Sequence, residues 1–151
     1  MPAKKLKEFL DENQVKYVTV THSPAYTARQ TAVSAHIPTK ELAKSVILMA
    51  DDKAVMVVVP ASQRVALGRM RKIIGAEAVC LADESQFQAL FPGCELGAMP
   101  PFGNLYGLEV YVSDKLSEDE LIAFNAGSHT ELVRMAYSDF ARLVKPAVVE
   151  F

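Results

Sequence analysis

The sequence contains few cysteines, and their spacing suggests no shared role. Cys80 and Cys94 are the only two in 151 residues, and they do not form a C-x-x-C pair. The first residues do not combine a basic segment with the apolar run that follows it in a secretory signal. We therefore expect a reduced, cytoplasmic setting in which both cysteines are buried apolar side chains rather than catalysts.

The sequence also lacks long hydrophobic runs, and its net charge is small. The apolar runs fall far below the roughly 18 to 20 residues of a membrane span, so no membrane partner is expected. The net charge of −2 argues against extensive wrapping of nucleic acid but permits a local basic patch. With half of its residues hydrophobic, the chain can bury the core of one ordinary domain, which we place at 1–151.

Two familiar kinds of catalytic motif are absent. His22, His36 and His129 are not spaced as metal ligands and have no cysteine cluster beside them, so we expect no metal and no cofactor. A Gly-x-Ser-x-Gly elbow is missing. Ser128 beside His129 does not make a dyad, because adjacent side chains in an extended turn tend to diverge. We do not expect a covalent serine mechanism.

Apolar periodicity and turn residues predict an α+β fold, a single domain with a mixed, largely antiparallel curved β-sheet covered by helices. The strands 44–50 and 54–60 are almost continuously apolar, which indicates a sheet covered on both faces. The predicted helices are 4–13, 27–35, 64–74, 83–90 and one from Ser138, and the other strands are 17–21, 78–81, 108–113, 121–125 and 132–136.

One loop, residues 97–103, cannot be helix or strand. Pro100 and Pro101 fix φ and remove two N–H donors, and a glycine stands at each end. A second glycine-bearing stretch, residues 125–129, ends in a histidine. Each stretch alone is typical of a rigid surface turn. Together we interpret them as two walls of one pocket that presents backbone groups to a small ligand.

Several side chains allow two interpretations. Lys44, at the entrance of a predicted strand, is either an edge charge that discourages strand pairing or an ammonium group that points into a site. Thr27 is either a helix N-cap or, with His22 and Tyr26, a ligand contact. Four cations of one predicted helix form either a solvated face or a phosphate-binding surface: Arg64, Arg69, Arg71 and Lys72.

The motif Gly97-x-x-x-Pro101-Phe102-Gly103, followed by Gly127-Ser128-His129, resembles the YbaK and prolyl-tRNA-synthetase editing-domain family, whose members deacylate mischarged aminoacyl-tRNA. The resemblance covers nearly the whole chain in element order, and the family also has a lysine that enters the strand of Lys44. It implies that Lys44, Gly97 and His129 are catalytic. The implied substrate-binding residues are His22, Tyr26, Thr27, Ser45, Met99, Pro101, Phe102, Gly127 and Ser128.

The resemblance implies metal-free hydrolysis of an aminoacyl ester by a positioned water, with the backbones of Gly97 and Gly127 as donors to the oxyanion. The implied partner is the 3′ aminoacyl-adenosine end of a mischarged tRNA, with Arg64, Arg69, Arg71 and Lys72 as its phosphate contacts. Whether the protein also needs a partner synthetase stays open, and we expect it to be a monomer. Met99 is adaptable enough to reshape a pocket, so the acyl group is undetermined. The alternative is a non-catalytic module that binds a nucleotide or an aminoacyl-adenylate-like ligand.

Overall fold

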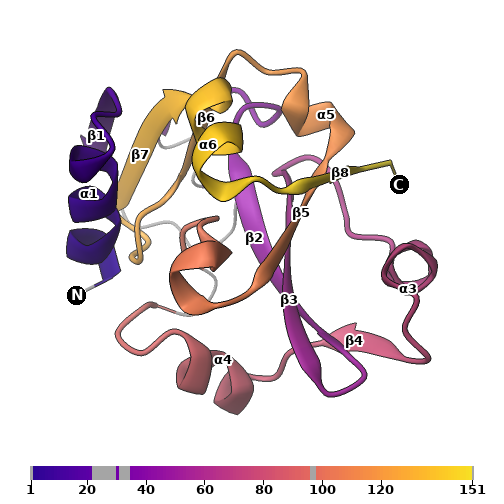
Figure 1. Cartoon of the computed structure of the whole chain (residues 1–151). Coiled ribbons are helices and arrows are strands. Elements are labelled where there is room, and N and C mark those ends of the chain that lie inside the picture. Colours follow the sequence, from indigo (N-terminus) through magenta and orange to yellow (C-terminus); the bar gives the residue numbers. More distant parts are fainter. Residues whose placement is uncertain (1, 22–29, 31–34, 96–97, 151) are drawn as a thin grey trace.

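The computed structural model describes residues 2–21, 30, 35–95 and 98–150 of the chain. Its first sheet has three antiparallel strands in the order β1-β7-β6. They are β1 (Tyr17–Thr21), β6 (Leu121–Asn125) and β7 (Glu131–Ala136). Strands β6 and β7 form a hairpin around the predicted turn at Gly127, Ser128 and His129, and β1 adds to the outer side of β7 (Figure 1).

The second sheet has five strands in the order β4-β2-β3-β5-β8. Strand β2 pairs antiparallel with β3 and β4, whereas β5 runs parallel to β3 and to β8. A single parallel bridge between Leu42 and Ala123 links the two sheets. The strands are β2 (Ala43–Ala50), β3 (Lys53–Pro60), β4 (Val79–Leu81), β5 (Glu109–Ser113) and β8 (Ala147–Val149). The α+β class with a mixed, largely antiparallel arrangement is confirmed, although the strands form two sheets rather than one.

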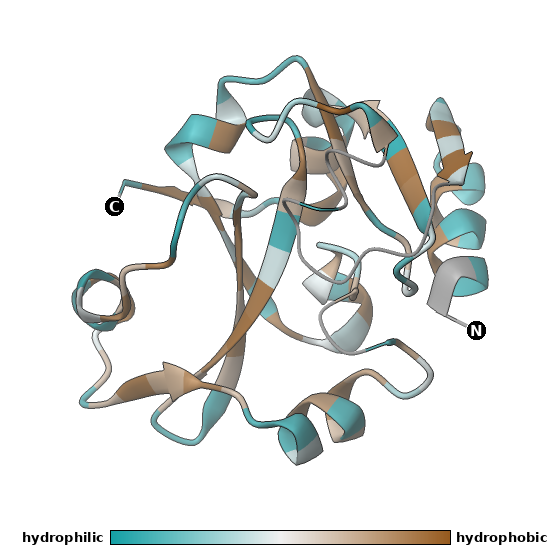
Figure 2. Ribbon diagram, turned by 180° about the vertical axis from the view of Figure 1, so that it is seen from behind, coloured by the Kyte–Doolittle hydropathy of each residue, from teal (hydrophilic) through white to brown (hydrophobic). Residues whose placement is uncertain are grey.

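Helices cover both faces of the five-stranded sheet, as the apolar strands predict. The larger core packs Ile47, Met56 and Val58 of one sheet face against side chains of α1, α4, α5 and α6. The other face packs Leu48, Val55, Val57 and Val59 around Met70 of α3. In Figure 2 the central strands are mostly hydrophobic and the turn between β2 and β3 is hydrophilic. The helices are α1 (Pro2–Glu12), α3 (Leu67–Ile74), α4 (Glu84–Leu90), α5 (Asp114–Ser117) and α6 (Tyr137–Val144).

Two predicted helix ends are confirmed by their caps. Asp83 accepts the N–H of Gln86 at 2.8 Å while the Gln86 side chain accepts the N–H of Asp83 at 2.9 Å, a reciprocal capping box at the start of α4. Gly75 ends α3 with φ at +79° and donates its N–H to Arg71 O. That left-handed conformation favours glycine over residues with a Cβ.

Helices α3 and α6 do not begin where the sequence predicts. Helix α3 begins at Leu67 rather than Arg64, because Ala66 is extended and has no capping side chain, and the Gln63 carboxamide accepts the hydroxyl of Ser113 at 2.7 Å. Ser138 lies inside α6 rather than at its N-cap, since the chain passes directly from β7 through Ala136 into the helix. The sequence analysis also missed α5, β8 and a 3-10 helix, η1 (Gly103–Tyr106).

The two cysteines are less buried than predicted. Cys80 is exposed on the short strand β4, and Cys94 is half-buried after α4. Burial raises the pKa of the Cys94 thiol to about 11, so this group stays protonated and unreactive near neutral pH. Both are free thiols. No helix in the described part of the chain has the length and apolarity needed to cross a membrane.

Candidate functional site

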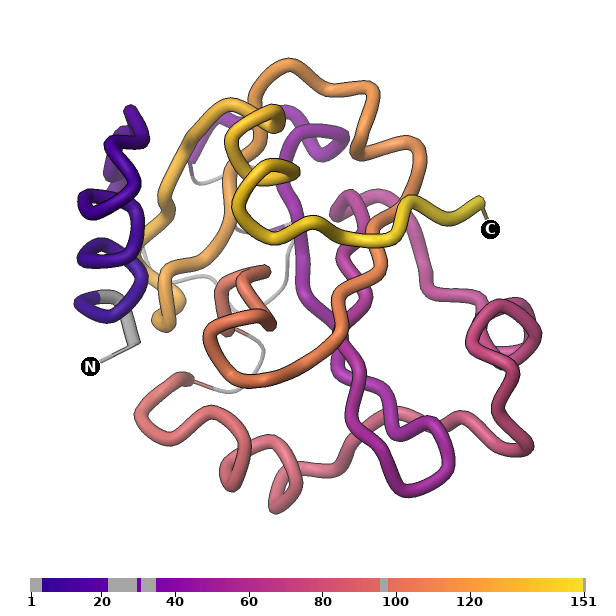
Figure 3. The backbone as a smooth tube through the Cα atoms, in the orientation of Figure 1, coloured from indigo at the N-terminus to yellow at the C-terminus, as the bar shows by residue number. Residues whose placement is uncertain are grey.

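The two glycine-bearing stretches lie side by side, as the sequence analysis expects. Gly127 donates its N–H to the carbonyl of Ala98 at 2.8 Å and accepts the N–H of Glu95 at 2.9 Å. Figure 3 shows the turn between β6 and β7 beside the segment that leads from α4 to η1. We call the described residues of these two segments, 94–95 with 98–103 and 126–130, the loop pair. Gly127 has φ at +99°, a conformation that favours glycine.

The same hydrogen bonds correct one expectation about the chemistry. Because the Gly127 N–H points at the carbonyl of Ala98 at 2.8 Å, it is already used and is not available to an oxyanion. Gly127 therefore joins the two segments of the loop pair rather than stabilising charge. The N–H of His129 is also used, since it donates to a carboxylate oxygen of Glu95 at 2.7 Å.

His129 is held firmly in this turn. Its side chain is buried, with 7% of the residue exposed, and the Glu95 carboxylate fixes its backbone from a distant part of the sequence. Next to it, the hydroxyls of Ser128 and Thr130 lie 3.3 Å apart. Sequence reasoning missed Glu95, because it stands 34 positions before His129 and belongs to no recognisable motif.

Lys44 is the second residue of β2 and is half-buried. Burial lowers the pKa of its amine, and the nearby positive charge of Arg64 lowers it further. Strand β4 pairs only with residues 48–50 of β2, so Lys44 lies on a stretch of β2 that pairs on one side alone among the described strands. Lys44 and Ser45 point to opposite faces of the sheet, because side chains alternate along a strand.

A small apolar cavity of about 200 Å³ lies between β2, the start of α4 and the loop pair. Ser45 and Met99, two of the predicted substrate-binding residues, line it together with Ile47 and Phe87. Val46, Leu81 and Ala82 complete the lining. The contribution of Phe87 was not predicted, since an apolar residue of an amphipathic helix is indistinguishable by sequence from any other core residue.

Phe102 and Pro101 play a different part from Met99. Phe102 is fully buried, with its ring 5.5 Å from the rings of both Phe124 and Phe140. Pro101 is buried beside it. Neither residue lines the cavity, so in this structure they hold the shape of the loop pair from the core side and make no surface for a substrate.

The basic residues of α3 are not brought together with the loop pair. Helix α3 covers the opposite face of the five-stranded sheet and lies across β2 and β3 from the β6–β7 turn (Figure 1). Arg69, Arg71 and Lys72 are exposed, and Arg69 donates its Nε–H to the carbonyl of Glu150 at 3.3 Å. Arg64 precedes the helix, and its positive charge lowers the pKa of the Lys44 amine.

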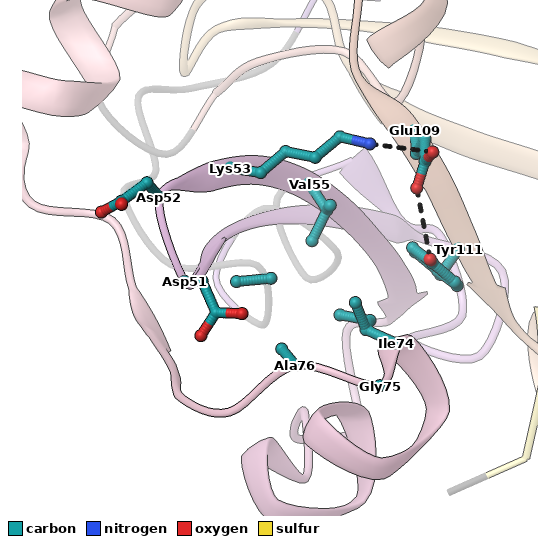
Figure 4. A pocket seen from close by; sticks show the side chains of 10 residues that line it. Asp51, Asp52, Lys53, Val55, Ile74, Gly75, Ala76, Glu109 and Tyr111 are labelled. Atoms are coloured by element: carbon teal, nitrogen blue, oxygen red, sulfur yellow. Dashed lines mark hydrogen bonds and ion pairs between the residues drawn. The ribbon is translucent and has the colours of Figure 1, made fainter.

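A larger cavity, about 640 Å³, lies elsewhere, at the turn between β2 and β3 and the end of α3 (Figure 4). Most of its charged groups already have partners. Lys53 Nζ lies 3.0 Å from Glu109 Oε1, and Tyr111 donates its hydroxyl to the same carboxylate at 3.4 Å. The Asp51 carboxylate accepts the N–H of Ala78 at 3.0 Å. The side chains of Lys53, Glu109 and Asp51 are therefore already engaged by the protein itself.

Four predicted site residues lie outside the described residues: His22, Tyr26, Thr27 and Gly97. The predicted helix 27–35 falls mostly outside them as well. Within the described ranges, no group of three or more histidine, cysteine, aspartate and glutamate side chains is placed to hold a metal ion.

Comparisons with known proteins bear on this arrangement. A multifunctional Ser/Thr-tRNA deacylase, ProXp-y of Escherichia coli, is 33% identical over 99 residues, which are 64% of this chain and 58% of that protein. The match thus spans less than two thirds of the relative. Among solved structures, a candidate trans-editing enzyme for prolyl tRNA synthetase superposes with a TM-score of 0.84 at 20% identity, covering 99% of this chain and 95% of that one.

The hypothetical protein APE2540 gives a TM-score of 0.86 at 18% identity and covers 97% of both chains. At these identities the structural neighbours establish the fold alone. Residues 22–143 match the aminoacyl-tRNA editing domain family, and this stretch contains the loop pair, Lys44 and the small cavity. The chain therefore belongs to the aminoacyl-tRNA editing domain family.

Proposed function

We propose that this protein deacylates mischarged aminoacyl-tRNA in trans. The observation that carries the proposal is the loop pair, in which the family's glycine motifs are joined by two backbone hydrogen bonds of 2.8 and 2.9 Å. Family membership over residues 22–143 and the deacylase named among its relatives support the same activity. The domain responsible is 1–151.

The reaction is hydrolysis of an ester. A water oxygen adds to the carbonyl carbon of the aminoacyl group, and the bond from that carbon to the ribose oxygen then breaks. The water's proton ends on the departing ribose oxygen, which leaves a free amino acid and an uncharged tRNA. An aminoacyl ester is already activated, so positioning a water and stabilising the oxyanion suffice. No protein nucleophile and no metal are required.

We assign three residues to the reacting end of the substrate. Lys44 holds the terminal adenosine or its phosphate, because its half-buried ammonium is a cation with no described carboxylate paired to it. The Gly127 N–H is engaged, so we assign the oxyanion donor to the backbone of Gly97. His129 orients the substrate or the water from a turn that Glu95 fixes, and Ser128 lies beside it.

The remaining substrate contacts follow from the sequence motifs. His22, Tyr26 and Thr27 would meet the terminal nucleotide at the pocket mouth. Arg64, Arg69, Arg71 and Lys72 would bind phosphates of the acceptor stem, which must then reach around the sheet edge to the face of α3. A partner synthetase can add tRNA selectivity. The protein would act where tRNA is charged and used, in the cytoplasm.

The test is single-turnover deacylation of a panel of mischarged tRNAs that carry alanine, cysteine, serine or threonine. We expect at least one ester to be hydrolysed well above its spontaneous rate. Binding of these tRNAs without hydrolysis of any ester would contradict the proposal and favour the alternative, a non-catalytic module for a nucleotide or an aminoacyl-adenylate-like ligand.

A further inference from the structure

The charges of helix α1 are not in the order that stabilises a helix. Lys4 and Lys5 stand in its first turn, which contains no acidic residue, and its last turn contains no basic residue. The helix dipole favours carboxylates at the start of a helix and cations at its end. The stability of α1 therefore does not explain why two lysines stand at its start.

This end of α1 lies beside the loop pair (Figure 3). Lys7 forms an ion pair with Glu131, the residue that follows the loop pair's second segment. Lys5 donates an Nζ–H to the carbonyl of Leu105 at 2.8 Å, and its ammonium group lies 4.4 Å from the centre of the Tyr106 ring. Both of these partners belong to η1, which continues the loop pair's first segment. The start of α1 therefore contacts the chain directly after each segment of the loop pair.

Lys4 and Lys5 carry charges that are open to an external anion. Lys5 contacts a carbonyl and an aromatic ring, and it forms no ion pair with a carboxylate in the described part of the chain. Lys4 lies 3.9 Å from Glu8, but the two side chains are 76% and 61% exposed, and such a pair in water is worth little. Lys7 is engaged with Glu131 and holds α1 to the β6–β7 hairpin.

A tRNA whose ester lies at the loop pair brings phosphates to this surface. The unpaired nucleotides before the terminal adenosine carry one negative charge each, and they have to leave the site over a neighbouring surface. The net charge of −2 gives the protein no general attraction for RNA, so local cations have to supply it. The cations of α3 lie on the opposite face of the sheet and are not placed to hold the phosphates closest to the ester.

We propose that Lys4 and Lys5 bind the phosphates of the unpaired nucleotides next to the aminoacyl-adenosine end of the tRNA. The proposal rests on the proposed deacylase function and adds the surface over which the RNA leaves the site. Lys5 would exchange the Leu105 carbonyl for a phosphate oxygen, which makes a stronger, charge-assisted hydrogen bond. Such contacts fix the position of the RNA without reading its sequence.

The test compares two ligands that share the reacting end and differ in their phosphates. One is the non-hydrolysable threonyl amide of 3′-amino-adenosine, which has no phosphate. The other carries the same amide at the 3′ end of a four-nucleotide single-stranded RNA. Calorimetry gives the affinities of both ligands for the parent protein and for the double variant Lys4→Gln, Lys5→Gln at salt concentrations from about 50 to about 200 mM.

Each phosphate contact on a single strand contributes about 0.7 to the slope of log affinity against log salt. The double variant should therefore lower the slope for the RNA ligand by about 1.4, which is about sevenfold in affinity over this salt range. The nucleoside amide should bind the parent and the double variant equally. An unchanged slope for the RNA ligand would overturn the proposal. An equal loss of affinity for both ligands would overturn it as well, because the lysines would then support the site itself.

Two control variants show whether the position of the lysines matters. Lys115→Gln combined with Lys145→Gln removes two exposed lysines, on α5 and after α6, and should keep the parent slope. Arg69→Gln combined with Arg71→Gln on α3 should also keep it, because the short RNA does not reach that face. A slope lost in either control and kept in the double variant of α1 would overturn the proposal.

Stability and activity are measured separately from binding. Lys4 and Lys5 are exposed, and their replacement removes cations from the positive end of the helix dipole. The melting temperature of the double variant should therefore be unchanged or raised. Since neither ligand can be hydrolysed, the affinities do not depend on catalysis. If no ester of the tRNA panel were hydrolysed, the deacylase function would fail, while a lowered slope in the double variant would still support the phosphate contacts.

Discussion

The loop pair and helix α3 lie on opposite faces of the five-stranded sheet. The loop pair is largely buried and hydrogen-bonded, whereas most of α3 is exposed. Residues 98–103 are all buried, and Gly127 bonds to the segment on both sides. Helix α3 buries only Met70 and exposes its cations. A reaction needs fixed groups, whereas binding to phosphates needs only charge that can reach them. The difference predicts that substitutions at the loop pair change the rate, and that substitutions on α3 change salt dependence.

The largest effect is expected at Lys44. Lys44→Ala should slow deacylation roughly 30- to 1000-fold, because a cation that contacts the substrate is lost. Burial lowers the pKa of this amine, so its charge is less favourable in the folded chain than in the unfolded chain. The melting temperature at neutral pH should therefore be unchanged or raised. Lys53→Ala, at the larger cavity, is the matched control and should keep the parent rate. If Lys44→Ala were as active as the parent, Lys44 would be only a charge at the edge of the sheet.

A smaller loss is expected at His129. If this residue orients the substrate, asparagine can replace much of its hydrogen bonding, and His129→Asn should lose less than about a hundredfold in rate. The measurement is the rate between about pH 5.5 and 8 under single-turnover conditions. If His129 were instead the general base, the parent rate would rise with pH in this range, and His129→Asn would lose both that rise and more than about a hundredfold in rate.

Two glycines test the contrast in packing. A Cβ at Gly103, next to the loop pair's prolines, would lie 2.8 Å from Val110 Cγ2 and 3.3 Å from Leu108 Cβ, so Gly103→Ala should destabilise the fold by about 1–3 kcal/mol. At Gly68 in α3 a Cβ meets nothing within 4 Å, and Gly68→Ala should stabilise by up to about 1 kcal/mol. Urea unfolding measures both. Equal effects of the two substitutions would mean that the loop segment is no more tightly packed than the helix.

The smallest effect concerns α3. If its cations contact the acceptor stem, changing Arg69 and Arg71 to glutamine should reduce the slope of log affinity against log salt by about 1 to 2. Lys145→Gln, on an exposed lysine after α6, is the control and should leave the slope as in the parent. An unchanged slope in the double variant would move the tRNA contact to another surface.

Sequence reasoning was most successful where a residue dictates backbone shape. Gly75, Asp83 and the strands 17–21 and 121–125 were placed correctly, because φ preference, capping and apolar periodicity are local properties. It failed where partners lie far apart in the chain. Glu95 fixes His129 across 34 positions, and Ala98 takes the N–H that Gly127 was expected to offer an oxyanion. The cation cluster of α3 was visible in sequence, but its place on the opposite sheet face was not.

The central claim is that the substrate's aminoacyl end binds at the loop pair. The most direct measurement follows backbone amide chemical shifts while a non-hydrolysable threonyl amide of 3′-amino-adenosine is added to the parent protein. The account predicts the largest shifts at residues 44–47, 98–99 and 127–129, with little change at residues 51–53 and 74–76 around the larger cavity. Shifts concentrated at residues 51–53 and 74–76, with the loop pair unmoved, would contradict it.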